Sequence, residues 1–292
     1  MITAFKYGKG FDLVSNLILH YKLSIVKVYS KLQLTKKYIH YLLTASNGKG
    51  HGIHSPFVFE FIKEVLNDKK NYDCYKKIEA LREQLKQNET ILTIEDFGAG
   101  SRADLQQKRK VSQIAKSALK SKKFSQLLFR IVNFYQPKNI LELGTSLGIT
   151  TAYLASGNLN AQVITMEGSH EIANVARKNF EQLHLKNLQL IEGNFDDNLP
   201  AIIHQLLTIN FAFIDGNHRK EPTLNYFNQL INHSTQSSIL IFDDIHWSKE
   251  MEEAWQEIQL HNSVSLTIDL FFIGLVFLRK ENKVKQHFII RY

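Results

Sequence analysis

The sequence predicts an α/β fold, a doubly wound and mostly parallel sheet of seven strands, behind a helical N-terminal segment. From Phe124 onward, short apolar runs alternate with amphipathic stretches, which is typical of strands joined by crossover helices. A glycine-containing turn follows the first of these runs. The last two runs are joined too tightly for a crossover helix, so we expect an antiparallel pair there. Residues 1–109 are predicted as the basic helical segment and residues 110–292 as the sheet domain.

The N-terminal segment carries helical signals of different strength. Residues 22–45 place apolar side chains at helical spacing with lysines between them, which predicts an amphipathic helix. Such a helix packs on its own domain or lies on a membrane surface. Ser55 and Pro56 fit the N-cap and first turn of a second helix. Residues 74–87 predict a third, more polar helix.

The strands of the second half are predicted in order from their apolar runs. Five parallel strands are expected at NILEL, QVITM, LQLIE, FAFID and SILIFDD, each next to an amphipathic stretch. The runs SVSLTIDLF and IGLVFLRK are expected to form the antiparallel pair that closes the sheet. HFIIRY is a candidate for a short further strand.

Composition and charge limit the class of protein. The chain has 292 residues, 44% of them hydrophobic, and one cysteine, Cys74, so an internal disulfide is excluded. No signal peptide and no membrane-length apolar run is evident, which predicts a cytoplasmic protein. Residues 1–135 hold 24 Lys and Arg against 11 Asp and Glu, whereas residues 136–292 hold 12 against 17. The basic half is interpreted as a solvated surface, with contact to nucleic acid or to an anionic membrane as alternatives.

Two stretches resemble nucleotide-binding loops, and only the second is complete. In ILELGTSLGITTAYLA, a buried strand leads through Gly144 and Gly148 into an apolar helix. Glu167 ends the following strand, 23 residues after Gly144, where an acid accepts hydrogen bonds from both ribose hydroxyls. The earlier loop at Gly98–Gly100 is followed by a polar, basic stretch and has no acid at the usual interval. We interpret it as a tight turn, with a lid over the ligand as the alternative.

The spacing of the second loop also indicates the kind of ligand. Dinucleotide-binding proteins use G-x-G-x-x-G, in which the middle glycine makes room for a pyrophosphate. Ser146 stands at that position here. A mononucleoside ligand is therefore favoured.

These motifs together resemble the class I S-adenosylmethionine-dependent methyltransferases. The resemblance is carried by ILELGTSLGITTAYLA, VITMEGS, LIEGNFDDNLP, FAFIDGNHRKEPTLNYF and ILIFDDIHW, and by the lead-in SKKFSQLLFRIVNFYQPK. Within that class they are similar to the small-molecule O-methyltransferases related to catechol and caffeoyl-CoA O-methyltransferases. The resemblance covers roughly residues 110 to 280 and implies a Rossmann-like methyltransferase fold whose last strand is antiparallel.

The resemblance implies roles for particular residues. The methionine part of S-adenosylmethionine would be lined by Gly144, Ser146, Gly148 and Thr150, with Glu167 on the ribose and Gly193 and Asn194 at the adenine, and Asp215 beside the cofactor. In the related enzymes an Asp and an Asp-Asn pair at two strand ends hold a divalent metal. The matching residues are Asp215, Asp243 and Asp244, so the pair here is Asp-Asp. Mg²⁺ or another divalent cation is the implied metal.

These residues predict a chemistry as well. Methyl transfer to a hydroxyl needs the hydroxyl to lose its proton, and His218, three residues after Asp215, is a candidate general base. A metal held by Asp215, Asp243 and Asp244 would polarise the acceptor oxygen. Without a metal, one carboxyl group should be protonated or paired with a base such as Arg219 or Lys249.

The sequence therefore predicts a methyltransferase that acts on a hydroxyl of a small molecule, with Asp215 and His218 as catalytic residues. Two alternatives stay open. An RNA methyltransferase would use the basic half to bind phosphates. A non-catalytic binding protein or a membrane-peripheral protein would use the same fold without transfer.

Overall fold

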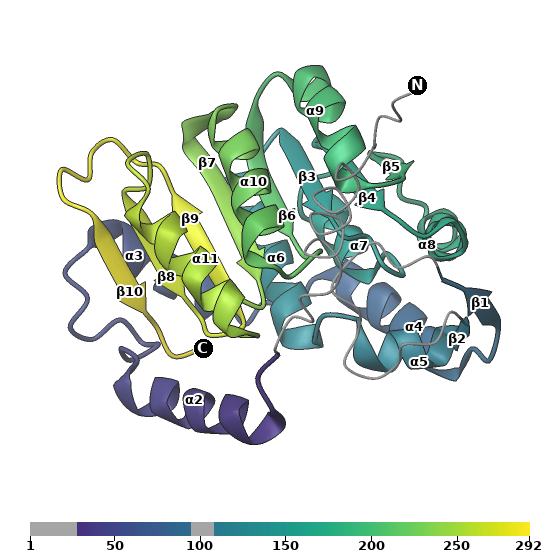
Figure 1. Ribbon diagram of the computed structural model, residues 1–292, viewed down its shortest axis with the longest axis horizontal. Helices are drawn as coiled ribbons and strands as arrows, with labels where there is room; N and C mark the ends of the chain where they lie inside the picture. Colours follow the sequence, from purple (N-terminus) through teal and green to yellow (C-terminus); the bar gives the residue numbers. More distant parts are fainter. Residues whose placement is uncertain (1–27, 95–107) are drawn as a thin grey trace, which may run out of the picture.

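A single large sheet dominates this computed structural model, which describes residues 28–94 and 108–292 (Figure 1). The loop at Gly98–Gly100 lies outside these described residues. Within them the sheet has eight strands. In spatial order they are β10 (Gln286–Ile289), β8 (Leu266–Asp269), β9 (Ile273–Phe277), β7 (Ser234–Asp243), β6 (Ile209–Ile214), β3 (Asn139–Leu143), β4 (Gln162–Glu167) and β5 (Leu188–Glu192).

The pairing of these strands confirms the predicted fold class. All neighbouring strands are parallel except β9, which runs antiparallel to both β7 and β8. The antiparallel pair β8–β9 is the one that the tight connection predicted. The HFIIRY stretch forms β10, which adds an eighth strand in parallel beside β8.

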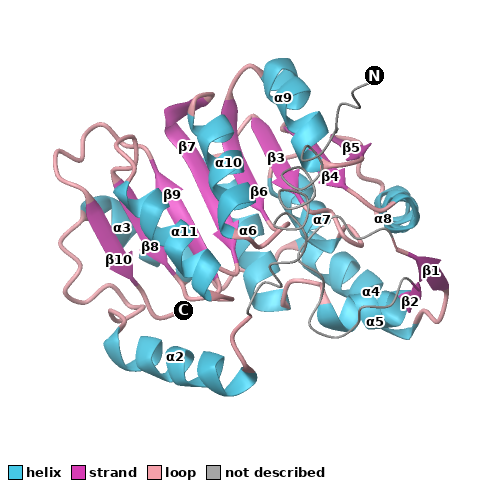
Figure 2. Ribbon diagram, in the orientation of Figure 1, coloured by secondary structure: helices cyan, strands magenta, loops and turns pink. Residues whose placement is uncertain are grey.

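Helices cover both faces of the sheet, as a doubly wound fold requires (Figure 2). Side chains alternate along each strand, so that Ile140 joins the core cluster on one face and Leu141 the cluster on the other. One face is covered by α6 (Lys122–Tyr135) and α7 (Ile149–Gly157), with α8 (His170–Gln182) beside α7. The other face is covered by α9 (Phe195–Leu206), α10 (Lys220–Ile231) and α11 (Lys249–Leu260).

Three N-terminal helices form close to where the sequence predicts them: α2 (Lys31–Thr44), α3 (Pro56–Phe61), which the π-helical turn η1 (Ile62–Leu66) extends, and α4 (Asp73–Gln87). A further helix, α5 (Val111–Ser117), forms in the basic stretch where the sequence predicted none, because its Val111, Ile114 and Ala115 side chains are buried. Ser55 caps α3 by accepting a hydrogen bond from Val58 N, and Pro56 occupies its first turn. Side chains of α3 and η1 join the core cluster of the sheet, while α4 packs with α7.

A small antiparallel pair crosses the predicted domain boundary. β1 (Ile91–Thr93) pairs with β2 (Lys108–Lys110), so that Ile91 faces Lys110. The division between residues 109 and 110 stays a prediction. The shared cores indicate that removal of the N-terminal helices would expose apolar surface of the sheet domain.

Helix α2 lies along one end of the molecule and is attached by partly buried charges. Lys37 Nζ pairs with Glu252 at 2.9 Å, and His246 lies between Glu252 (3.0 Å) and Asp269 (2.8 Å). Burial alone would lower the pKa of His246, but Asp269 and Glu252 raise it to about 9. His246 therefore carries a positive charge near neutral pH and links α11 to β8 under α2.

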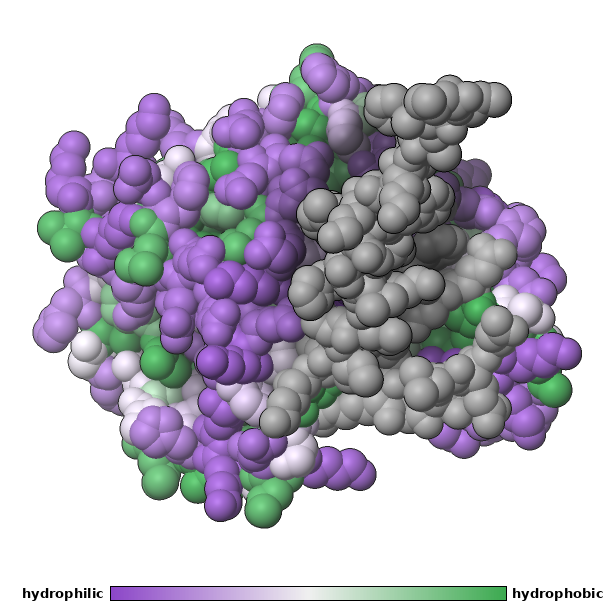
Figure 3. Space-filling view, in the orientation of Figure 1, coloured by the Kyte–Doolittle hydropathy of each residue, from purple (hydrophilic) through white to green (hydrophobic). Residues whose placement is uncertain are grey.

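The outer face of α2 is apolar. Leu32, Ile39 and Leu43 recur at helical spacing and are exposed, in a region where Figure 3 shows apolar surface at the edge of the molecule. Among the helices of the described ranges, none is long and apolar enough to cross a membrane.

A buried acid in the central strand makes the stability of the fold depend on pH. The Glu142 side chain is fully buried and accepts hydrogen bonds from the Thr151 and Thr165 hydroxyls. Burial raises the pKa of Glu142 to about 8, although both hydroxyl groups act in the opposite direction. The folded protein therefore keeps Glu142 protonated at a pH where the unfolded chain has already lost that proton.

We predict that Glu142→Gln removes a pH-dependent loss of stability. The stability due to this group is complete below the pKa of 4.5 in the unfolded chain and is lost as the pH rises to about 8. The free energy of unfolding of Glu142→Gln, relative to wild type, should therefore rise by up to about 1.4 kcal/mol per pH unit across this window. Urea unfolding at several pH values measures this. Parallel curves for the two proteins would show that Glu142 is ionised in the fold.

Candidate active site

The predicted site residues lie together at the carboxyl ends of β3, β4, β5, β6 and β7. β3 is the switch point of the sheet, because the chain continues to β4 on one side and returns later to β6 on the other. Ligands of open α/β sheets bind at such a point, outside the carboxyl ends of the strands. The topology therefore places the candidate site at this edge of the sheet.

The turn between β3 and α7 adopts a left-handed backbone at three positions. The φ angles are 107° at Gly144, 48° at Ser146 and 80° at Gly148. Gly144 N and Thr145 N both donate to Met166 O, at 3.1 and 3.0 Å, which ties the turn to β4. A Cβ atom at Gly144 would overlap Asp215 O, so the close approach of the β3 and β6 ends requires glycine here.

The carboxylate of Glu167 is held in place by this turn. Ser146 N donates to Glu167 Oε2 at 2.8 Å, and Ser169 N donates to Oε1 at 3.0 Å. Both bonds orient the side chain at the end of β4, directly beside the glycine turn. A fixed acid in this position fits the ribose of a nucleoside, so the residues present fit S-adenosylmethionine.

The other predicted cofactor residues lie at the same edge. Thr150 is buried in the first turn of α7. Gly193 follows β5 with a φ of 122°, and a Cβ there would meet the Asn198 side chain. Asn194 caps α9 by accepting a hydrogen bond from Asp196 N at 3.1 Å. Their contacts with a cofactor stay predictions.

Three of the predicted catalytic and metal residues form one compact group. Asp215, His218 and Asp243 each offer a ligand atom, and these atoms lie within 4.8 Å of one another. His218 Nε2 lies 3.5 Å from Asp215 Oδ1. Asp244 is not a member of this group in the described structure. Its backbone has a φ of 52°, and its N–H donates to Phe272 O at 2.7 Å.

A lysine that the sequence did not single out completes the group. Lys120 lies in the loop between α5 and α6, and its Nζ pairs with Asp243 Oδ2. The Asp243 side chain is buried, with 1% of it exposed, and the Lys120 side chain is largely buried, with 12% exposed. We name Lys120, Asp215, His218 and Asp243 the acid–lysine cluster.

The cation expected from the sequence is a different one. Lys249 is 79% exposed and pairs with Glu253 at 3.6 Å, so it is not the partner of these acids. Arg219 stands at the N-cap of α10. Three other lysines lie close to Lys120 in the sequence, namely Lys116, Lys122 and Lys123. No spacing in the sequence distinguishes Lys120 from them.

Burial and mutual charge set the protonation of the cluster. Burial alone would raise the pKa of Asp215, but Lys120 and His218 lower it to about 2. Burial and the charge of Asp215 raise the pKa of Asp243 well above its usual range, against the attraction of Lys120. Burial would lower the pKa of Lys120, but Asp243, Asp215 and Asp244 raise it. The cluster therefore holds an ionised Asp215 and a charged Lys120, with Asp243 as the acid that keeps a proton most readily.

His218 is a stronger base in this setting than in water. Burial alone would lower the pKa of His218, but the carboxyl groups of Asp215 and Asp244 raise it above 6.5. A proton taken up by the ring is thus stabilised by the acids beside it.

The acid–lysine cluster is where the predicted divalent metal would bind. Its donor types suit a cation, and Asp243 Oδ1 is buried without a hydrogen-bond partner in the described structure. The Lys120 ammonium, however, already lies on the other oxygen of Asp243, and a dication beside it would be repelled. In this arrangement the residues do not fit a divalent ion, and the predicted metal site stays a prediction.

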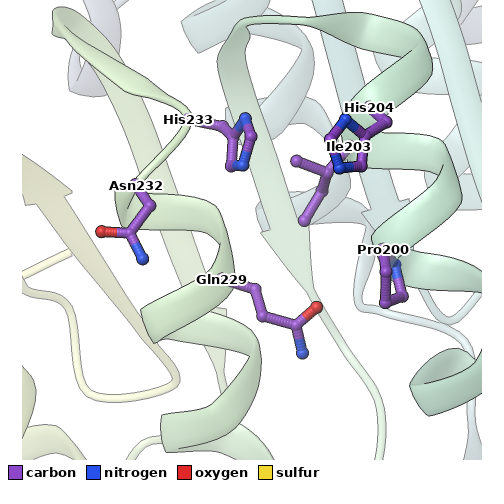
Figure 4. Close-up of a pocket in the computed structure, with 6 residues that line it drawn as sticks. All are labelled: Pro200, Ile203, His204, Gln229, Asn232 and His233. Atoms are coloured by element: carbon purple, nitrogen blue, oxygen red, sulfur yellow. The ribbon is translucent and has the colours of Figure 1, made fainter.

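A pocket at the opposite edge of the sheet is separate from this site. Figure 4 shows side chains of α9 and of the end of α10 on either side of it, near the amino ends of β6 and β7. Its volume is about 180 Å³, and it is lined by Pro200, Ile203, His204, Gln229, Asn232 and His233. Ligands of this class of sheet bind at the carboxyl edge, so this pocket is not the candidate active site.

The stretch that builds this edge of the sheet is similar to a known family. A family model described as a methyltransferase domain matches residues 141–245, which run from β3 past the end of β7. This match confirms the predicted resemblance to the class I S-adenosylmethionine-dependent methyltransferases.

Individual relatives agree with that class. A catechol O-methyltransferase from Niastella koreensis is 32% identical over 126 residues, which are 42% of this chain and 55% of that protein. The match thus spans about half the length of this curated relative. An O-methyltransferase from Bacillus cereus in complex with SAH is 21% identical with a TM-score of 0.50, covering 76% of this chain and 97% of that chain. An SAH-bound methyltransferase from Podospora anserina is 12% identical with a TM-score of 0.54, covering 77% and 97%. At these identities the two structures show the shared fold.

We predict that Gly144→Ala disrupts the site, because the new Cβ would push Asp215 away from the glycine turn. Unfolding in urea should show a loss of about 3 kcal/mol or more, the sum of a left-handed backbone and overpacking.

The matched control is Gly52→Ala. Gly52 also has a positive φ, 78°, but a Cβ there meets no atom within 4 Å. It should cost only about 1 kcal/mol. Equal losses in the two variants would mean that the contact between the ends of β3 and β6 is unimportant.

Proposed function

We propose that this protein is an S-adenosylmethionine-dependent methyltransferase that methylates a hydroxyl group of a small molecule. The observation that carries the proposal is the position of Glu167, held by Ser146 N and Ser169 N beside the glycine turn, at the same edge of the sheet as the acid–lysine cluster. A nucleoside site and a general base thus meet at one edge of the sheet.

The choice of a hydroxyl acceptor has two supports. The curated relative is named as a catechol O-methyltransferase. In addition, a hydroxyl needs a base to remove its proton, and the cluster offers His218 with Asp215 beside it.

When bound, S-adenosylmethionine supplies an electrophilic methyl group, whose bond to sulfur breaks with the electron pair left on sulfur as the acceptor oxygen attacks. The residues of this chain supply orientation and proton transfer. Glu167 and the glycine turn would hold the nucleoside and so orient the methyl group for transfer.

His218 accepts the proton of the acceptor hydroxyl while the new oxygen–carbon bond forms. Its Nε2 faces Asp215 Oδ1, which leaves Nδ1 as the nitrogen for the acceptor and stabilises the imidazolium that results. No step needs a divalent ion, because Lys120 supplies positive charge to the same carboxyl groups.

The cofactor site is tested by the affinity for S-adenosylhomocysteine. Glu167→Ala should weaken binding at least about tenfold, since hydrogen bonds to a carboxylate contribute about 1.5–3 kcal/mol each. Glu253→Ala removes a carboxylate from the surface of α11 and should leave binding unchanged. Calorimetry measures both. Unchanged affinity of Glu167→Ala would remove this residue from the site.

The base is tested by the rate of methyl transfer from labelled S-adenosylmethionine to a panel of phenols and alcohols. His218→Ala should lower kcat by about 10²–10⁴-fold, with little change in affinity for S-adenosylhomocysteine. The control is His204→Ala, which removes a histidine from the pocket at the opposite edge. Transfer to RNA with no transfer to the panel would overturn the small-molecule assignment.

A further inference from the structure

Lys120 is a buried cation whose role the proposed reaction leaves unexplained. Its ammonium group reaches from the loop before α6 into the carboxyl edge of the sheet and lies on Asp243. Lysine is rarely buried to this extent unless an acid accompanies it. Here the acid is the end residue of β7, at the centre of the candidate site.

Hydrogen bonds to its backbone carbonyl also hold Lys120 in position. Arg82 Nη1 donates to Lys120 O at 2.8 Å, and Arg82 Nη2 donates to Ser125 Oγ at 3.2 Å. The Ser125 hydroxyl in turn donates to Lys120 O at 3.2 Å. Lys120 is therefore fixed at its backbone while its ammonium is fixed by Asp243.

Arg82 is itself held. It is buried, and its Nε donates to Glu79 at 3.1 Å, while Tyr153 OH donates to Glu79 at 2.8 Å. Glu79 and Arg82 belong to α4, and Tyr153 belongs to α7, the helix after the glycine turn. A chain of largely buried polar contacts thus runs from α7 through α4 to the lysine.

The charges explain what the lysine does. Asp215 and Asp243 end neighbouring parallel strands, so their carboxyl groups face each other across a few ångströms and repel. Unless one of them keeps its proton, positive charge has to lie between or beside them. A divalent metal is one solution, and a lysine ammonium is another.

We propose that Lys120 takes the place of a divalent cation in this site: it neutralises the Asp215–Asp243 pair, keeps Asp215 beside His218, and makes methyl transfer independent of metal. Lys120 acts through Asp243 and Asp215, so it is a positioning residue. The statement about methyl transfer rests on the proposed function. The statement that Lys120 excludes a divalent cation does not depend on it.

The first test measures Mn²⁺ binding to the full chain after treatment with a chelator, by calorimetry and by electron paramagnetic resonance. Wild-type protein should bind Mn²⁺ no more tightly than millimolar. Lys120→Ala should bind at least about tenfold more tightly, because it leaves the acid group without a counter-charge and with room for an ion. Lys122→Ala, which removes an exposed lysine two residues away, should resemble wild type.

A double variant guards against misfolding of Lys120→Ala. Lys120→Met with Asp243→Asn removes both charges of the pair while keeping similar volumes, so it should fold and gain no Mn²⁺ affinity. Tight Mn²⁺ binding by wild type would overturn the proposal. Failure of Lys120→Ala to gain affinity, when its thermal unfolding is cooperative, would overturn it equally.

The second test measures methyl transfer in EDTA. Wild-type activity should be unchanged, whereas Lys120→Ala should lose at least about a hundredfold in kcat and recover part of it with Mg²⁺ or Mn²⁺. Its affinity for S-adenosylhomocysteine should match wild type, which separates this effect from loss of the cofactor site. Loss of wild-type activity in EDTA would contradict the proposal but would leave the methyltransferase assignment intact. Absence of any transfer would contradict the proposed function, while the Mn²⁺ result would still decide the role of Lys120.

Discussion

Two ionised carboxyl groups at the ends of adjacent parallel strands repel each other, and the repulsion is relieved only by a proton or a positive charge beside them. β6 and β7 are parallel and in register, with Ile214 opposite Phe242, so the next residues, Asp215 and Asp243, meet at the same edge. When both are ionised, their negative charges push the two side chains apart. Lys120 satisfies this constraint, and the position of the loop before α6 follows from it.

This requirement gives the N-terminal helices a part in the candidate site. Arg82 of α4 holds the backbone of Lys120, and Glu79 of the same helix holds Arg82. The cofactor motifs all lie after residue 135, so the sequence separates the two parts of the chain by function. In the folded protein, α4 reaches the site through one lysine without contacting the strand ends itself.

Sequence reasoning predicted what depends on local pattern. The alternation of apolar runs and helices, the antiparallel β8–β9 pair and the Ser55 N-cap follow from periodicity and capping chemistry, and the structure has all three. The glycine turn and Glu167 were predicted because a turn, a helix and an acid have a known spacing. Their adjacency in the fold agrees with that expectation.

What the sequence did not predict depends on contacts between distant segments. Lys120 lies 123 residues before Asp243, and other lysines around it look the same in the sequence. The expected base, Lys249, is close to the acids along the chain, but its helix points it to solvent. Lys120 can be identified only from the fold, in which the loop before α6 lies at the edge of the sheet beside Asp243.

The attachment of α2 has a consequence for how the chain folds during synthesis. Its partners come from the far end of the sequence: Lys37 pairs with Glu252, and Tyr41 OH donates to Ile290 O. A ribosome adds about 5–20 residues per second, so α2 would wait roughly ten to fifty seconds for these partners to emerge. During that interval Tyr38 and Tyr41 have no sheet to pack on, whereas the leucines and isoleucine of the outer face are exposed before and after docking. The first described helix of the chain is thus among the last to find its partners during synthesis.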